Sequence, residues 1–212
     1  MKSPVSLQTN QTIVFIGDSI TDAGRLEIPY RPFGCGYVHF LAYQMLAKYP
    51  QHNLNLINTG ISGNTIRDLD QRWERDCLDL KPDILSVLIG INDVCRQYYD
   101  SQNEPVFLDE YELTYQRVLT SVKQKSDCRI ILIQPFLFCE DTDDPIYKTL
   151  RKYIEVVNKL ADKFDALLIP LQDFIDKKIR QIPPHKWSDD MMHPYIWAHA
   201  WIAQRWAETT GL

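Results

Sequence analysis

The chain has 212 residues, of which 45% are apolar and 24% charged, a composition unlike that of disordered, collagen-like or disulfide-scaffold proteins. Its 23 basic and 28 acidic residues give a net charge of −5, so we expect no nucleic-acid partner. This length suits one hydrophobic core, and we expect a single domain over residues 1–212.

Short apolar runs alternate with helical patterns along the chain. The runs are rich in β-branched residues and lack polar alternation, as in strands covered on both faces, and they span residues 13–16, 54–57, 84–89, 130–133 and 167–169. Between them, apolar residues at spacings of three and four predict helices over residues 37–46, 66–78, 109–122, 147–164, 174–179 and 195–209.

This alternation predicts an α/β fold, a flavodoxin-like three-layer α/β/α sandwich. Its parallel sheet has five strands in the order 2-1-3-4-5. The longest segments predicted to be irregular are residues 17–34, 90–106, 135–144 and 182–193, and three of them follow a strand directly. Ligands bind outside the carboxyl ends of such strands, so we expect the functional site in these loops.

Three segments that follow strands carry residues suited to acyl chemistry. Ser19 lies where the first strand ends, although a serine in a turn is more often a local hydrogen-bond partner, and no G-x-S-x-G elbow occurs. Gly60 and Gly63 follow the second strand, where free N–H groups can bind a negative oxygen; the alternative is a tight turn before a helix capped by Thr65. Asn92 follows the third strand and either donates its amide N–H or caps the loop.

A pair of residues near the carboxyl terminus completes the set. Asp190 precedes His193 by three residues, which places a carboxylate on Nδ1 of the imidazole and leaves Nε2 free as a base. Alone this spacing is a weak signal, because acidic neighbours of histidine are common on surfaces. With Ser19, Gly63 and Asn92, however, the pair supplies a nucleophile, oxyanion donors and an oriented base along one edge of the sheet.

Four segments resemble the sequence blocks of the SGNH, or GDSL-type, hydrolases, in the family's order: residues 17–20, 60–65, 90–93 and 190–194. The resemblance implies one SGNH hydrolase domain over residues 1–212, acting as a serine ester hydrolase through an acyl-serine intermediate. Ser19 is similar to the nucleophile, and Asp190 and His193 to the acid and base. The oxyanion donors are then the N–H groups of Ser19 and Gly63 and the Asn92 amide. No cofactor and no metal are implied.

Residues 67–69, 72–73, 90–94, 96–98 and 108–112 resemble a branch with intracellular acetylxylan esterases, which deacetylate short xylo-oligosaccharides and in some cases form large rings. This implies an acetylated sugar or another small ester as substrate, and a homo-oligomer. Trp187 and Tyr98, in loops at the edge of the expected site, are candidate platforms for a sugar ring. The alternatives are a lysophospholipase, a short-chain thioesterase or arylesterase of the same family, and a non-catalytic carbohydrate-binding module that kept the fold.

Charged residues near the blocks allow two interpretations. Arg67, Arg72 and Arg96 are either ordinary helix and loop charges, or one of them pairs with Asp18 or Asp93 behind the nucleophile. The first interpretation is the more common one for arginines at such positions.

Cysteine usage and the amino terminus indicate a compartment. The five cysteines are widely spaced without a C-x-x-C pair, which argues against a disulfide framework and a zinc site. The amino-terminal residues lack the apolar stretch of a signal peptide, and no run of about 18 apolar residues occurs. We therefore expect a cytoplasmic protein without a membrane partner.

Overall fold

A computed structural model describes residues 4–99 and 104–212. At its centre lies a sheet of five parallel strands in the order β2-β1-β3-β4-β5. The strands are β1 (Thr12–Gly17), β2 (Asn55–Asn58), β3 (Ile84–Leu88), β4 (Arg129–Ile133) and β5 (Leu167–Ile169). The predicted fold class, sheet and strand order are confirmed.

The central strands are apolar because both of their faces are covered. β1, β3 and β4 are buried along almost their whole length, whereas the edge strand β2 begins at an exposed residue. Gly17 lies opposite Leu88, and Leu88 lies opposite Ile133, so the three strands end at one level. The loops that follow them therefore start along one edge of the sheet.

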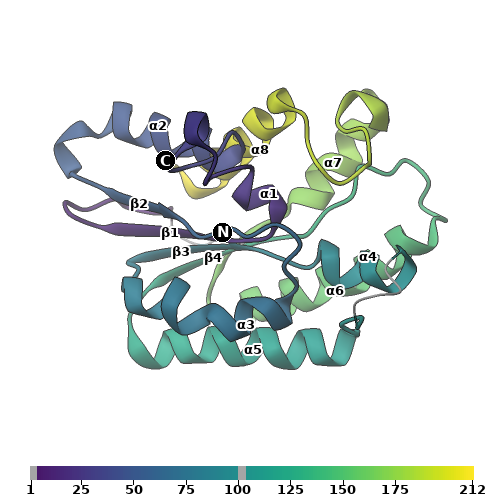
Figure 1. Ribbon diagram of the computed structural model, residues 1–212, viewed down its shortest axis with the longest axis horizontal. Coiled ribbons are helices and arrows are strands. Elements are labelled where there is room, and N and C mark those ends of the chain that lie inside the picture. The colour runs from purple at the N-terminus through teal and green to yellow at the C-terminus, as the bar shows by residue number, and fades with distance from the viewer. Residues whose placement is uncertain (1–3, 100–103) are drawn as a thin grey trace.

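Helices cover both faces of the sheet, as Figure 1 shows. On one face lie α1 (Ser19–Asp22), α2 (Tyr37–Lys48), α7 (Leu171–Ile179) and α8 (Ile196–Thr210). On the other lie α3 (Ile66–Asp76), α4 (Ile91–Tyr99), α5 (Leu108–Lys125) and α6 (Pro145–Lys163). Short 3₁₀ turns are η1 (Ile28–Tyr30), η2 (Pro50–His52), η3 (Leu78–Leu80) and η4 (Pro184–Lys186). Within the layers, α2 packs along α8, and α5 packs along α3 and α6.

Local sequence signals begin two of these helices. At the start of α3, the Thr65 hydroxyl accepts from the Asp68 amide, and the Asp68 carboxylate accepts from the Thr65 amide, which forms a capping box. At the start of α6, the Asp144 carboxylate accepts two backbone amides and Pro145 occupies the first helical position. These contacts satisfy amides that have no partner within the helix.

Residues 90–106 were predicted to be irregular, but they contain helix α4. Ile91, Val94 and Cys95 form its buried face at a spacing of three and four. Gly90 and Asn92 are residues typical of turns, and they mask this short helical pattern in the sequence. The helix forms because its apolar face packs against α6. The four-residue helix α1 also lies in a segment predicted to be irregular.

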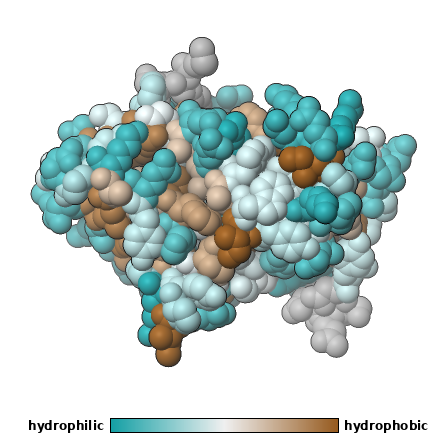
Figure 2. All heavy atoms as spheres, turned by 90° about the horizontal axis from the view of Figure 1, so that it is seen from above, coloured by the Kyte–Doolittle hydropathy of each residue, from teal (hydrophilic) through white to brown (hydrophobic). Residues whose placement is uncertain are grey.

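The surface is largely hydrophilic, and Figure 2 shows apolar side chains scattered in small groups over one face. Large apolar side chains exposed over more than half of their area include Leu26, Ile28, Tyr99, Phe107, Leu113 and Ile196. In the described parts of the chain, no helix combines the length and apolarity needed to cross a bilayer.

Candidate active site

Ser19 and His193 meet at the carboxyl end of β1. Ser19 is the first residue of α1, separated from the strand only by Asp18, and His193 lies in the loop that leads to α8. The Ser19 Oγ atom lies 2.8 Å from His193 Nε2, across 174 residues of sequence. His193 Nδ1 lies 2.5 Å from Asp190 Oδ2. The three side chains form one continuous hydrogen-bonded chain.

The charge on Asp190 decides where the protons lie. Its Oδ1 atom accepts from the Ser188 hydroxyl at 2.8 Å and from the amides of Met192 and His193 at 2.9 and 2.8 Å. Partial burial acts to raise the pKa of Asp190, but the hydrogen bonds, above all that from His193, outweigh it and hold the pKa well below its usual range. Because a carboxylate only accepts, Nδ1 carries the ring proton and Nε2 accepts from Ser19.

Asp189 takes no part in this chain. It accepts a hydrogen bond from the hydroxyl of Tyr195 and is exposed to solvent. Of two adjacent carboxylates, only the one three residues before His193 contacts the imidazole.

Three N–H groups at this edge of the sheet are candidates to bind an oxyanion. Asn92 Nδ2 donates one hydrogen to the Asn64 carbonyl oxygen at 3.0 Å. Across residues 4–99 and 104–212, no protein acceptor binds its second hydrogen, the amide of Ser19 or the amide of Gly63. The Ser19 amide is free because it belongs to the first turn of a helix. These three donors are the ones that the sequence singled out.

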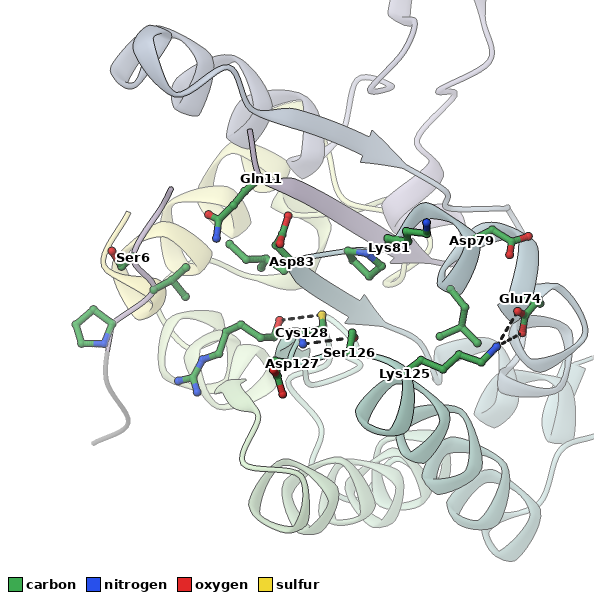
Figure 3. Close-up of a pocket in the computed structure, with 16 residues that line it drawn as sticks. Ser6, Gln11, Glu74, Asp79, Lys81, Asp83, Lys125, Ser126, Asp127 and Cys128 are labelled. Atoms are coloured by element: carbon green, nitrogen blue, oxygen red, sulfur yellow. Dashed lines mark hydrogen bonds and ion pairs between the residues drawn. The ribbon is translucent and has the colours of Figure 1, made fainter. Parts of the chain in front are cut away.

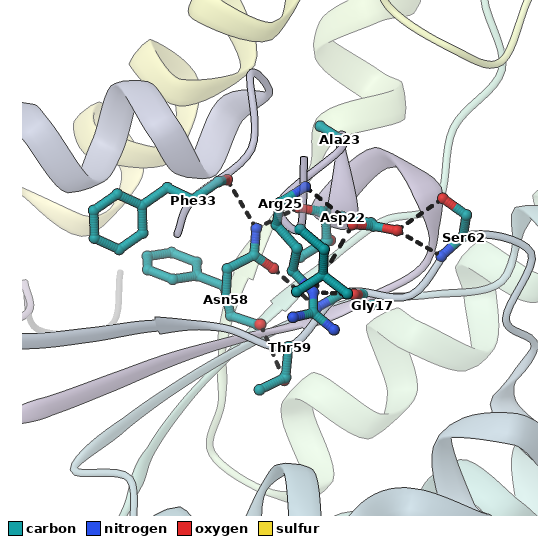
Figure 4. Close-up of polar contacts among 12 residues, drawn as sticks. Gly17, Asp22, Ala23, Arg25, Phe33, Asn58, Thr59 and Ser62 are labelled. Carbon is teal, nitrogen blue, oxygen red and sulfur yellow. Dashed lines mark hydrogen bonds and ion pairs between the residues drawn. The ribbon is translucent and has the colours of Figure 1, made fainter. Parts of the chain in front are cut away.

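The loop that carries Gly63 is held against α1 by polar contacts. Figure 4 shows the Asp22 carboxylate facing Ser62, whose amide and hydroxyl donate to it at 3.0 and 2.9 Å. The Arg25 Nε atom donates to the Gly60 carbonyl oxygen at 2.5 Å. A Cβ atom on Gly60 would lie 2.3 Å from the Asp22 amide nitrogen, so only glycine allows this approach. The loop and the start of α1 therefore form one unit.

Arg72 forms hydrogen bonds to backbone groups at the ends of both β1 and β2. Its guanidinium donates to the carbonyl oxygens of Gly17 at 3.0 Å and Thr59 at 2.7 Å, and to Asn64 Oδ1 at 2.7 Å. The side chain is 8% exposed and pairs with Asp76 at 2.9 Å. Burial lowers the pKa of Arg72, although the hydrogen bond to Asp76 acts in the opposite direction. Four hydrogen-bonded neighbours thus fix this cation next to the strand that presents Ser19.

Two buried carboxyl groups lie behind the site. Asp18 and Asp93 are fully buried, and one oxygen of each accepts from a backbone amide, that of Ile20 and that of Ile66. The Oδ2 atom of each has no partner among the described residues. Burial raises the pKa of Asp18 and that of Asp93 to about 7 each. Both groups therefore hold a proton in mildly acidic solution.

No arginine pairs with these two acids in the described structure. Arg67 pairs with Glu110, Arg72 with Asp76, and Arg96 lies 3.7 Å from Asp68. The interpretation in which one of the three arginines pairs with Asp18 or Asp93 is therefore wrong, because each of them faces another carboxylate.

The sequence also identifies proteins that are related to this chain. The profile of the GDSL-like Lipase/Acylhydrolase family matches residues 15–208. The chain belongs to this family. It is accordingly a carboxylic ester hydrolase, and the match includes Ser19, Gly63, Asn92, Asp190 and His193.

Similar proteins of known structure share the whole fold of this GDSL-like hydrolase. An acetylxylan esterase of Geobacillus stearothermophilus is 35% identical over 213 residues, which cover 98% of this chain and 97% of that protein. A crystal structure of an acetylxylan esterase from that organism matches with a TM-score of 0.92 at 34% identity, covering 98% and 97% of the two chains. An alpha/beta hydrolase from the metagenome of Lake Arreo, Spain, matches with a TM-score of 0.90 at 32% identity over 97% of each chain.

Of the two aromatic residues predicted to bind sugar in this hydrolase, Trp187 is buried. Its ring stacks on Phe138 at a centroid distance of 5.2 Å and packs against Trp197 at 4.6 Å. No face of the ring is open to a ligand, so the prediction for Trp187 is wrong. Tyr98 is 43% exposed and its hydroxyl lies 2.6 Å from Thr149 Oγ1, so its role in binding a sugar stays a prediction.

A cavity of about 950 Å³ lies at the opposite edge of the sheet (Figure 3). Lys81, Asp83, Lys125 and Asp127 line it at the amino ends of the strands. Ser19 is not among its lining residues. This cavity is therefore separate from the site formed by Ser19 and His193.

Sequence reasoning did not identify Asp22, Arg25 and Arg72 as residues that hold this site together. Their partners are mostly in distant loops: the carbonyl oxygens that Arg72 binds lie 13 and 55 residues away. Such contacts leave no motif. The one available signal is that Arg72 stands beside Trp73 on the face of α3 that is buried.

Proposed function

We propose that this enzyme removes acetyl groups from xylo-oligosaccharides, with residues 1–212 acting as one SGNH hydrolase domain. Ser19 is the nucleophile, His193 the base and Asp190 the acid that orients it. The observation that carries this proposal is the hydrogen-bonded chain from Ser19 Oγ through His193 to Asp190, at 2.8 and 2.5 Å. Related variants described as catalytic mutants replace a serine, a histidine and an aspartate of the Geobacillus enzyme, the last two three positions apart, which supports the assignment.

In the first half of the reaction, Ser19 Oγ attacks the acetyl carbonyl carbon as its proton passes to His193 Nε2. The carbonyl oxygen becomes negative and accepts hydrogen bonds from the amides of Ser19 and Gly63 and from the Asn92 side chain. The bond from carbon to the sugar oxygen then breaks. His193 returns the proton to that oxygen, which leaves as a sugar hydroxyl, and Ser19 remains acetylated.

In the second half, a water molecule replaces the sugar. His193 Nε2 takes a proton from the water as its oxygen attacks the acetyl carbon, and the same donors bind the oxyanion. The bond to Ser19 Oγ breaks, acetic acid leaves, and the serine recovers its proton from His193. Asp190 stays ionised throughout and stabilises the imidazolium that forms in each half.

The choice of an acetylated sugar rests on the relatives and on the exposed side chains near the site. The Geobacillus relative, described as an acetylxylan esterase, aligns with 98% of this chain. Tyr98, exposed on the same helix as Asn92, provides an aromatic side chain, which suits a polar sugar ring better than an acyl chain.

A substrate panel tests the proposal. Acetate release from acetylated xylo-oligosaccharides and from p-nitrophenyl acetate should exceed turnover of p-nitrophenyl octanoate by at least about 10-fold, because a short acyl group suits a deacetylase. Ser19→Ala should lower kcat by at least about 10³-fold. Ser126→Ala is the matched control, since Ser126 lies at the opposite edge of the sheet. An octanoate preference, or an active Ser19→Ala protein, would contradict the proposal.

We also propose a cytoplasmic homo-oligomer. All five cysteines are free thiols and four are buried, which suits a reducing compartment. Exposed Leu26 and Ile28 lie close together in sequence and offer apolar surface for a second copy. Light scattering should give a mass that is a multiple of 24.8 kDa. A mass equal to that of one chain would contradict the oligomer.

A further inference from the structure

Three side chains bind the two-residue segment Gly63–Asn64. Arg96 Nη2 donates to the Gly63 carbonyl oxygen at 2.7 Å. Asn92 Nδ2 donates to the Asn64 carbonyl oxygen at 3.0 Å, and Arg72 Nε donates to Asn64 Oδ1 at 2.7 Å. Both backbone carbonyl groups of this short segment are therefore held by side chains from α4, and the Asn64 side chain is held by one from α3.

The backbone conformation of Gly63 depends on such contacts, because Gly63 has no side chain that packs against its surroundings. Its φ of +80° lies in the left-handed region, and a Cβ atom there would meet nothing within 4 Å. Glycine is the residue with the greatest backbone freedom, and this one faces open space instead of packed atoms. The direction of its amide depends on the groups that bind its neighbouring atoms.

Arg96 is the side chain that binds Gly63 itself. It lies one helical turn after Asn92 on α4, so that both point from one face of the helix toward the loop. The cationic donor makes a stronger hydrogen bond to a carbonyl than a neutral donor does. Asp68, at 3.7 Å from the same nitrogen, keeps the guanidinium on this side.

We infer that Arg96 is a positioning residue for the proposed hydrolysis. By holding the Gly63 carbonyl oxygen, it fixes the peptide unit that follows Gly63, and so it limits the backbone rotation that would turn the Gly63 N–H away from the oxyanion that forms when Ser19 attacks an ester. Arg96 touches neither the ester nor the reacting atoms. This inference rests on the proposed function, since it assigns a task to one donor of the oxyanion hole.

Losing this contact affects the transition state more than substrate binding. The carbonyl oxygen of the ester becomes strongly negative only during the reaction. A misdirected donor therefore lowers kcat and leaves KM nearly unchanged. Removal of a whole oxyanion donor costs about 10²–10³ in kcat. Arg72 and Asn92 still hold Asn64 when Arg96 is lost, so we expect a smaller loss, of about 10–100-fold.

The test compares Arg96→Ala and Arg96→Lys with Arg117→Ala, an exposed arginine that pairs with Asp70 on the far side of α3. With p-nitrophenyl acetate, Arg96→Ala should lose about 10–100-fold in kcat with KM changed by less than about 3-fold. Arg96→Lys should recover part of this loss, because the ammonium group also donates to a carbonyl. Arg117→Ala should match the wild type, and all variants should share its Tm within about 2 °C.

A second measurement does not depend on activity. Hydrogen exchange of a peptide covering residues 59–65 should be faster in Arg96→Ala than in wild type and in Arg117→Ala. An unchanged kcat, a loss that falls on KM, or a lysine variant as impaired as the alanine variant would overturn the inference. If the wild type hydrolyses no ester, the proposed function fails, and the exchange of residues 59–65 alone decides whether Arg96 holds this loop.

Discussion

Two adjacent carboxylates, Asp189 and Asp190, have different hydrogen-bond partners. Asp190 contacts the imidazole of His193, and it also accepts two backbone amides that fix its orientation. Asp189 accepts from Tyr195 and is exposed. A difference of one position in the sequence therefore decides which carboxylate contacts the imidazole. The two residues form a matched pair for mutation.

We expect Asp190→Ala to lower kcat by about 10³–10⁴-fold, because His193 loses the partner that fixes its tautomer and stabilises its charge. Asp189→Ala should stay within about 3-fold of wild type. Steady-state kinetics with p-nitrophenyl acetate measures both. If Asp189→Ala lost most of its activity while Asp190→Ala stayed active, Asp189 and not Asp190 would be the acid that orients His193.

Among the elements, helix α3 links local sequence to the site. The capping box of Thr65 and Asp68 fixes where the helix begins, and Arg72, two turns later, therefore lies beneath the ends of β1 and β2. The start of α3 was predicted from the sequence, but the role of Arg72 was not. Helix caps depend on residues within four positions, whereas the acceptors of Arg72 are distant backbone carbonyls.

Thr65→Ala should lower the free energy of unfolding by about 1 kcal/mol, because it leaves a helix amide without its acceptor. For a domain of this size the loss corresponds to a fall in Tm of about 2–4 °C. Thr120→Ala is the control, since the Thr120 hydroxyl only donates to the Gln116 carbonyl one turn back in α5. Equal Tm values for Thr65→Ala and wild type in thermal unfolding would show that the cap contributes nothing.

At the scale of the whole molecule, the sheet and the order of its strands followed from the sequence because apolar runs and crossover rules are strong constraints. The same reasoning placed Ser19, Gly63, Asn92 and the loop of His193 at one edge. It failed where burial depends on the assembled fold. Trp187 lies in a loop rich in polar residues, yet it is enclosed by aromatic rings from α8 and from the loop after β4.

The buried acids make the stability of the molecule depend on pH. In the unfolded chain Asp18 titrates near 3.8, whereas burial raises its pKa to about 7 in the fold. Between these values the folded state holds a proton that the unfolded chain has lost, so the free energy of unfolding falls as pH rises, and the whole penalty is present above pH 7. Asp18→Asn removes this charge and keeps an acceptor for the Ile20 amide.

The Asp18→Asn protein should therefore gain several degrees in Tm relative to wild type at pH 8, and clearly less at pH 5. Thermal unfolding of both proteins at the two pH values measures the difference. Asp162→Asn is a suitable comparison, because Asp162 is exposed. The same gain at pH 5 and at pH 8 would mean that Asp18 is not protonated in the fold.

The contact between Ser19 and His193 joins residues 174 positions apart. During synthesis, the serine leaves the ribosome early, while its base is added 174 residues later. A nascent chain can thus fold much of its sheet while the Ser19 hydroxyl still lacks the base that activates it. Hydrolysis can begin only after His193 has been added and has met Ser19, so the appearance of activity reports on this late contact.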